Sequence, residues 1–200
     1  MIVTKRVTYV SQDGFEFRLE PVEDTISIEK TKDGYVAKYL VRSDGMCDDS
    51  PDSWQDEGLF LVNYHRNFQV ERDNIITEDD VKNWYAGEKI EQSKEYHIFM
   101  LSCLVHSGVW LSLNYSFNCD AGGWDTSHVG VVLVAKKEMK TRKKAFRLAQ
   151  TLINDWNTYL SGDVYDIVKE YYSKNKEAID YDCVCAFYTI EHALAELKQF

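Results

Sequence analysis

Two Asp-Gly pairs near the N-terminus constrain the fold of this chain more than any other local feature. Asp13-Gly14 and Asp33-Gly34 each lie between short runs in which apolar and polar residues alternate. Alternation is typical of strands with one buried face, and an Asp-Gly pair between two such runs predicts a β-hairpin. The sequence therefore predicts two successive hairpins over residues 1–42, which together form an antiparallel β-meander.

An acidic, turn-rich segment follows these hairpins. Residues 43–57 show no apolar periodicity, and they contain one of the two prolines of the chain. Segments rich in Asp, Ser, Gly and Pro are typical of loops and domain boundaries. We therefore expect a separable N-terminal meander over residues 1–42 and a core domain over residues 43–200.

Beyond residue 57, segments typical of strands occur in runs, with segments typical of helices between and after them. Apolar runs of strand length occupy 58–65, 96–106, 109–117, 128–136, 163–172 and 181–189. A short helix is predicted over 77–85, with Thr77 as N-cap, and a closing helix over 189–198. Apolar residues spaced by three and four predict an amphipathic helix over 140–160 that ends at Gly162. This pattern predicts an α+β fold, in which a long amphipathic helix and a C-terminal helix pack on a mostly antiparallel sheet.

The charge of the chain narrows its possible partners. The 33 acidic and 23 basic residues give a formal net charge of −10, which disfavours attraction to nucleic acid or to an anionic membrane. The one dense basic run, at 136–147, is expected to be a solvated helix face. No segment resembles a signal peptide or a membrane helix, and the five cysteines are irregularly spaced. We therefore expect a cytoplasmic protein with reduced thiols and a neutral or basic protein partner.

Three motifs carry a family resemblance. They are His-Ser-Gly at 106–108, a cysteine followed by Trp-Asp within 119–125, and Gly-Asp-Val-Tyr at 162–165. In this order and spacing the chain resembles, over residues 50–200, a family of uncharacterised bacteriophage and mobile-element proteins. It departs from the family pattern where Asp-Ala-Gly-Gly replaces a single proline before Trp124, and where Asp166 replaces a glycine. The resemblance implies a phage or mobile-element context and implies no activity.

Five residues form a candidate catalytic cluster: His65, His106, Cys119, Asp125 and His128. If the fold brings them together, they could activate a thiol or bind zinc, as in a small hydrolase-like enzyme. The chain contains neither a Gly-x-Ser-x-Gly elbow nor a Walker loop. Since close Cys-x-x-Cys and His-x-x-x-His pairs are also lacking, we expect no bound metal and no cofactor.

Two further features of the sequence have a structural interpretation, and the second also has a functional one. Cys183 and Cys185 lie on one face of a predicted strand, where their spacing is typical of core packing. Arg66 follows the acidic segment 43–57, so its guanidinium could pair with that segment or bind a phosphate or carboxylate of a ligand.

The loop at 118–128 is the candidate recognition surface. Its glycines predict an adaptable loop at the end of the sheet, with Trp124 leaning on the core and Asp120, Asp125 and His128 exposed to solvent. Adaptable polar loops on rigid strands favour recognition over catalysis, because catalytic side chains must be held rigidly.

The leading hypothesis for function is therefore protein binding. We expect a small acidic phage or mobile-element protein that binds a host protein, such as a nucleic-acid-binding defence protein, in counter-defence of the anti-restriction or anti-CRISPR type or in host takeover. The alternative is the hydrolase-like enzyme. The sequence leaves the oligomeric state open.

Overall fold

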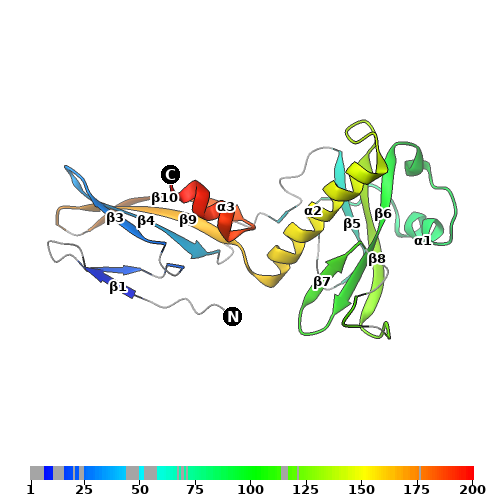
Figure 1. The fold of residues 1–200 in the computed structure, drawn as a ribbon, viewed down its shortest axis with the longest axis horizontal. Helices are drawn as coiled ribbons and strands as arrows, with labels where there is room; N and C mark the ends of the chain where they lie inside the picture. The colour runs from blue at the N-terminus through cyan, green and yellow to red at the C-terminus, as the bar shows by residue number, and fades with distance from the viewer. Residues whose placement is uncertain are drawn as a thin grey trace. The chain divides into compact units, whose positions relative to one another are not determined.

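The computed structural model describes residues 7–10, 16–19, 21–22, 25–43, 50–51, 58–66, 68, 70, 72–113, 117–120, 122–175 and 177–200. The chain divides into two compact units. Unit 1 comprises Met1–Asp48 together with Gly162–Phe200, and unit 2 comprises Asp49–Ser161. Each unit contains a four-stranded antiparallel sheet (Figure 1).

The antiparallel strands occur in runs, with helices between and after them, which confirms the predicted α+β class. In unit 1 the elements are β1 Val7–Val10, β2 Glu16–Leu19, β3 Ser27–Lys30, β4 Gly34–Arg42, β9 Tyr165–Ser173, β10 Ala178–Phe187 and α3 Ile190–Leu197. In unit 2 they are β5 Leu59–Asn63, α1 Glu78–Tyr85, the 3-10 helix η1 Glu91–Lys94, β6 Tyr96–Val105, β7 Val109–Ser112, β8 Thr126–Ala135 and α2 Arg142–Ser161. Within the described residues, no helix combines the length and apolar character needed to cross a membrane.

The sheet of unit 2 has the strand order β5-β8-β6-β7, and helix α2 packs against one of its faces. The apolar stripe predicted over 140–160 supplies Ile153 and Trp156, both fully buried in this core. Truncating a buried Trp to Ala typically costs about 3–5 kcal/mol, so this contact contributes strongly to the unit. Asn157 of α2 also accepts a hydrogen bond from the Leu111 amide and donates one to the Leu111 carbonyl, which satisfies the backbone of β7.

Helix α1 packs on the other face of this sheet. Thr77 caps it as predicted: its hydroxyl accepts a hydrogen bond from the Asp80 amide, and the Asp80 carboxylate accepts one from the Thr77 amide. Val81 of α1 is buried in a cluster with Val131 and Leu133 of β8. Strand β8 is therefore covered on both faces, which explains why its sequence is a continuous apolar run.

A β-bulge in β8 changes which side chains point to each face. Leu101 of β6 pairs with Gly130, whereas the next residue, Ser102, pairs with His128, so Val129 is the extra residue. Val129 joins the core that contains α2, whereas the His128 ring lies against Tyr85 of α1, with 5.7 Å between ring centroids. The bulge thus turns His128 out of the core and toward α1.

The sheet of unit 1 has the strand order β10-β9-β4-β3. Helix α3, capped by the Thr189 hydroxyl, packs its buried Ala193 in a cluster with Leu40 of β4 and Ile167 of β9. The hairpin predicted at Asp33-Gly34 is present as the antiparallel pair β3 and β4.

The predicted N-terminal meander is not continuous in the described residues. Strands β1 and β2 pair with each other in a separate two-stranded sheet, and β2 and β3 are not neighbours. The predicted Asp13-Gly14 turn lies outside the described residues.

The predicted division at residue 42 also differs from the structure. Strand β4 pairs with β9 along its whole length, from Gly34 opposite Ser173 to Arg42 opposite Tyr165. The N-terminal strands and the C-terminal strands therefore belong to one unit, and residues 49–161 are inserted between them. Alternation shows that a strand has a buried face, but it does not identify the strand's partner, which here lies more than a hundred residues away along the chain.

Gly130 is the position where the sheet of unit 2 tolerates no side chain. A Cβ atom at Gly130 would lie 1.9 Å from the carbonyl oxygen of Val62, a backbone atom of the adjacent strand β5. We expect Gly130→Ala to destabilise unit 2 by more than about 3 kcal/mol, because backbone atoms on both strands would have to separate. All five tryptophans of the chain lie within unit 2, so fluorescence during urea unfolding measures this loss.

Gly87→Ala is the matched control. Gly87 has φ +88, and no atom lies within 4 Å of its Cβ position. Only backbone strain of about 1–2 kcal/mol is expected there. Equal losses for the two variants would contradict the steric explanation.

Candidate functional site

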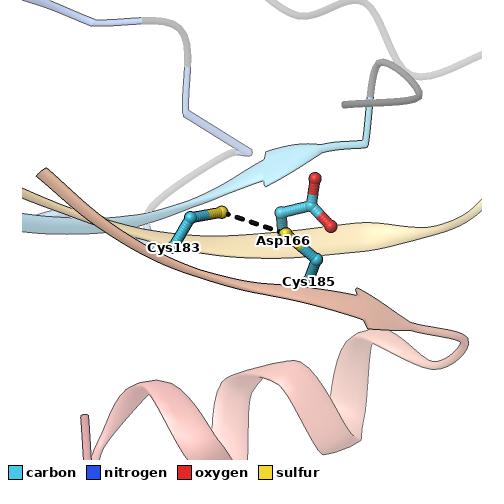
Figure 2. A group of neighbouring side chains, drawn as sticks. All are labelled: Asp166, Cys183 and Cys185. Carbon is cyan, nitrogen blue, oxygen red and sulfur yellow. Dashed lines mark hydrogen bonds between the residues drawn. The ribbon is translucent and has the colours of Figure 1, made fainter. Parts of the chain in front are cut away.

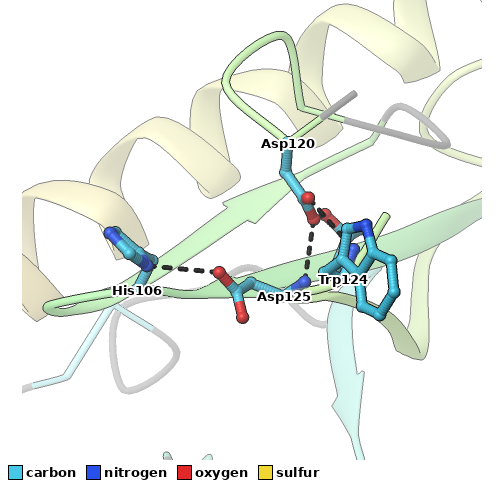
Figure 3. Close-up of polar contacts among 5 residues, drawn as sticks. His106, Asp120, Trp124 and Asp125 are labelled. Carbon is cyan, nitrogen blue, oxygen red and sulfur yellow. Dashed lines mark hydrogen bonds and ion pairs between the residues drawn. The ribbon is translucent and has the colours of Figure 1, made fainter. Parts of the chain in front are cut away.

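The loop that leads into β8 is organised by one carboxylate, that of Asp120 (Figure 3). This carboxylate accepts hydrogen bonds from the Trp124 amide at 3.0 Å, the Asp125 amide at 3.0 Å and the Thr126 hydroxyl at 2.7 Å. The Thr126 hydroxyl, followed by these backbone amides, lowers the pKa of Asp120 because each of them stabilises the charged form. Asp120 was expected to contact solvent, but its main contacts are with the loop itself.

Trp124 does not lean on the core, so that part of the prediction is wrong. The side chain is 91% exposed. Its indole lies over Gly122, where an added Cβ would come within 2.4 Å of the indole Cδ1 and Nε1 atoms. Because Gly122 has no Cβ, the indole can lie against the loop backbone at this position, and most of the ring faces solvent.

Asp125 and His106 form a second contact at this end of the sheet. His106 Nδ1 lies 3.2 Å from Asp125 Oδ2, and Figure 3 shows the two side chains pointing toward each other. The Val105 amide also donates to the Asp125 carbonyl at 3.0 Å. These contacts connect the loop to the His-Ser-Gly hairpin, whose Ser107 has the positive φ of a tight turn. Asp125 is exposed, as predicted.

His128 belongs to a different surface, on the α1 side of the sheet. Its Nδ1 lies 3.1 Å from the Ser102 hydroxyl. With His65 it lines a depression of about 170 Å³, whose rim includes Glu78 and Lys82 of α1. The structure therefore brings together His65 with His128, and separately His106 with Asp125.

The predicted catalytic cysteine is not part of either pair. Cys119 is exposed on the loop, and within the described residues no hydrogen bond joins its thiol to His65, His106 or His128. The buried Cys103 thiol is also unsuited to nucleophilic chemistry, because burial raises its pKa to about 11. The predicted cluster of five residues therefore consists of two pairs and a separate cysteine.

The interpretation of Arg66 remains a prediction. Its side chain is exposed. The acidic residues proposed to pair with it, Asp48, Asp49, Asp52 and Asp56, lie outside the described residues.

A groove next to the basic run of α2 was not predicted from the sequence. Trp84, Phe99, Met100 and Phe146 line a groove of about 740 Å³, with Arg142, Lys143 and Arg147 at its rim. Arg142 is not simply solvated, because its guanidinium donates to the Ile98 carbonyl at 2.9 Å and lies 4.5 Å from the centre of the Phe99 ring. The signal in the sequence was Phe146, an apolar residue within the basic run.

Comparisons of the chain with family models, with curated proteins and with solved structures found no match.

The order of the loop is expected to depend on the Asp120 carboxylate. Asp120→Ala removes all three hydrogen bonds, whereas Asp120→Asn keeps one acceptor oxygen. Amide hydrogen exchange at Trp124 and Asp125 should therefore be fastest in Asp120→Ala and intermediate in Asp120→Asn. Asp125→Ala, which removes another carboxylate from the same loop, should leave the Trp124 amide protected. Equal exchange in Asp120→Ala and the original protein would contradict this role.

The lowered pKa of Asp120 also predicts how the loop responds to acid. The pKa of this carboxyl is lower in the folded state than in the unfolded state, where it is about 3.9 for Asp. Its stabilisation of the fold is therefore complete above the unfolded pKa and is lost as the pH falls through the folded pKa. The amide NMR signals of Trp124 and Asp125 should thus change only below the ordinary Asp range. Asp120→Asn, which has no carboxyl at this position, should lack this transition. A midpoint at or above about 3.9 would disprove the proposed stabilisation.

Proposed function

We propose that this chain is a protein-binding module whose principal contact is the Trp124 loop, residues 118–125, which precede β8. The observation that supports this proposal is the 91% exposure of Trp124. Tryptophan is among the residues most enriched at binding hot spots, where a large ring fills a pocket of the partner and excludes water. A single exposed indole on an anchored loop suits this role.

The hydrogen bonds around Asp120 support the same proposal. Binding costs less conformational entropy when the contact surface is ordered before the partner arrives. Asp120 fixes the amides of Trp124 and Asp125, and the contact between His106 and Asp125 connects the loop to the neighbouring hairpin. The backbone on both sides of the indole is therefore ordered in the unbound protein.

Charge indicates the kind of partner. The net charge of −10 and the exposed Asp125 carboxylate favour a neutral or basic surface around an apolar pocket that accepts the indole. The family resemblance over residues 50–200 supports a host protein as this partner, in the cytoplasm of a cell that carries the phage or mobile element. A nucleic-acid-binding defence protein combines a basic surface with such a context, so the module would act in counter-defence.

The geometry favours binding over the hydrolase-like alternative. A thiol hydrolase requires an imidazole within hydrogen-bond reach of the cysteine. Among the described residues, the hydrogen bonds of His106 and His128 go to Asp125 and Ser102 rather than to Cys119. Both sides of the His106–Asp125 contact are also open to water, with His106 74% exposed.

The test compares two surface tryptophans. Wild type and the variants Trp124→Ala and Trp110→Ala are used to capture proteins from a bacterial host lysate, and the captured protein is then purified and titrated directly. Trp110, on β7, is 45% exposed and serves as the matched control. Trp124→Ala should raise the dissociation constant at least about 30-fold, because losing a hot spot costs about 2 kcal/mol of binding free energy. Trp110→Ala should change it little.

Stability and activity measurements separate the possible outcomes. Because Trp124 makes little contact with the core, its removal should leave the melting temperature almost unchanged. The combined variant Asp125→Ala, His128→Ala should weaken binding less than Trp124→Ala does. The binding proposal is wrong if neither Trp124→Ala nor the combined variant affects binding. It is also wrong if these variants abolish a hydrolytic turnover instead.

A further inference from the structure

Three potential metal ligands come together in the sheet of unit 1 (Figure 2). Asp166 lies on β9, and Cys183 and Cys185 lie on the adjacent strand β10. One carboxylate oxygen and the two sulfur atoms all lie within 4.8 Å of one another. This cluster belongs to unit 1 and is independent of the Trp124 loop.

Strand pairing places Cys183 opposite Val168 of β9, two residues from Asp166, and an irregularity that follows in β10 fixes the carboxylate. Val184 pairs with Ile167 and Phe187 pairs with Tyr165, so β10 has one extra residue between these two pairs. Ala186, inside this interval, has φ 67, and its amide donates to Asp166 Oδ1 at 3.0 Å. The irregular backbone thus holds the carboxylate beside the cysteines.

The two sulfur atoms are close enough to bind one ion. Cys183 Sγ and Cys185 Sγ are 3.3 Å apart. Two sulfurs bound to a tetrahedral Zn²⁺ at about 2.3 Å lie about 3.8 Å apart, so a change of about half an ångström would suffice. Both side chains are half-buried, not fully buried as core packing predicted.

The burial of Asp166 favours a cation at this place. Asp166 is only 3% exposed, although it carries an ionisable group. A buried carboxylate is costly unless charges or several hydrogen bonds compensate for its lost hydration. In the described part of the chain, the Ala186 amide is its hydrogen-bond donor. A metal ion between the three side chains would supply the missing positive charge.

The oxidation state of Cys185 controls access to such a site. Cys183 is not in a disulfide, but Cys185 is disulfide-bonded. Because the ligand is the thiolate, the disulfide must first be reduced. A phosphine reductant supplies two electrons and is oxidised to the phosphine oxide, while water supplies the oxygen and two protons; the S–S bond breaks, and Cys185 and its disulfide partner become thiols. Metal binding then releases the protons of Cys183 and Cys185 to solvent.

We propose that Cys183, Cys185 and Asp166 form a redox-gated site for a thiophilic divalent cation of the zinc class. Two thiolates and one carboxylate suit Zn²⁺, Cd²⁺ or Co²⁺, and they do not suit Ca²⁺ or Mg²⁺, which prefer oxygen ligands. With three protein ligands, a water molecule completes the coordination. This site departs from the expectation, drawn from sequence spacing, that no metal is bound.

The first test is titration of the full chain with Co²⁺, with and without a phosphine reductant. In the reduced protein, we expect one Co²⁺ per chain and the near-ultraviolet absorption band of cobalt bound to thiolates. The oxidised protein should not show the band. Cys183→Ser and Cys185→Ser should abolish the band, and Asp166→Asn should weaken binding at least about tenfold. Cys119→Ser, which removes an exposed thiol from unit 2, should bind Co²⁺ as the original protein does.

A second measurement needs no substitution, so it also applies if a variant fails to fold. The reduced original protein is alkylated with iodoacetamide in the presence or absence of Zn²⁺, and each cysteine is followed by mass spectrometry. Zn²⁺ should protect Cys183 and Cys185 and leave Cys119 reactive. Equal labelling of Cys183 and Cys185 with and without Zn²⁺ would overturn the proposal, as would a cobalt band that persists in Cys183→Ser.

Discussion

The structure of unit 2 depends on the burial of strand β8. Val131, Val132, Leu133 and Val134 are fully buried, two facing α2 and two facing α1. Burying apolar surface on both faces contributes roughly 1.5–3 kcal/mol per large side chain, and this fixes the strand between β5 and β6. The loop that precedes β8 then starts from a rigid base, because the first residue of the strand, Thr126, is also a hydrogen-bond donor to Asp120. The exposed indole thus lies two residues before a strand whose C-terminal part, from Val129 to Ala135, is buried.

Helices and strands could be predicted from the sequence because their signals are local. The Thr77 cap and the spacing of apolar residues in α2 are contained within a few turns of helix. The pairing of β4 with β9 could not be predicted in this way, since it joins residues such as Arg42 and Tyr165 across the whole inserted unit. The apolar pattern of a strand shows which of its faces are covered, but the neighbouring strands pair through backbone groups, which are the same in every residue except proline, so the pattern does not identify them.

The errors at the candidate sites have a common physical cause. The general tendency of tryptophan to be buried predicted that Trp124 would contact the core, but the Asp120 carboxylate fixes the neighbouring amides and directs the ring outward. Regular alternation predicted that Cys183 and Cys185 would be packed in a core, but both side chains are only half-buried and lie beside the Asp166 carboxylate of β9. In both places a contact with one carboxylate overrides the average behaviour of the residue type.

The order of the two units along the chain imposes a constraint on folding. Strands β4 and β9 are neighbours in the sheet, and their ends are joined by the Ser43 amide, which donates to the Val164 carbonyl, and by the ion pair of Arg42 with Asp163. Pairing them closes a loop that contains all of residues 49–161, and loop closure costs more entropy as the flexible loop becomes longer. Every strand pair of unit 2 lies inside that loop, so the sheet of unit 2 needs no strand from unit 1. Folding of unit 2 before β4 pairs with β9 would replace a long flexible loop with a compact one and would lower the entropic cost of that pairing.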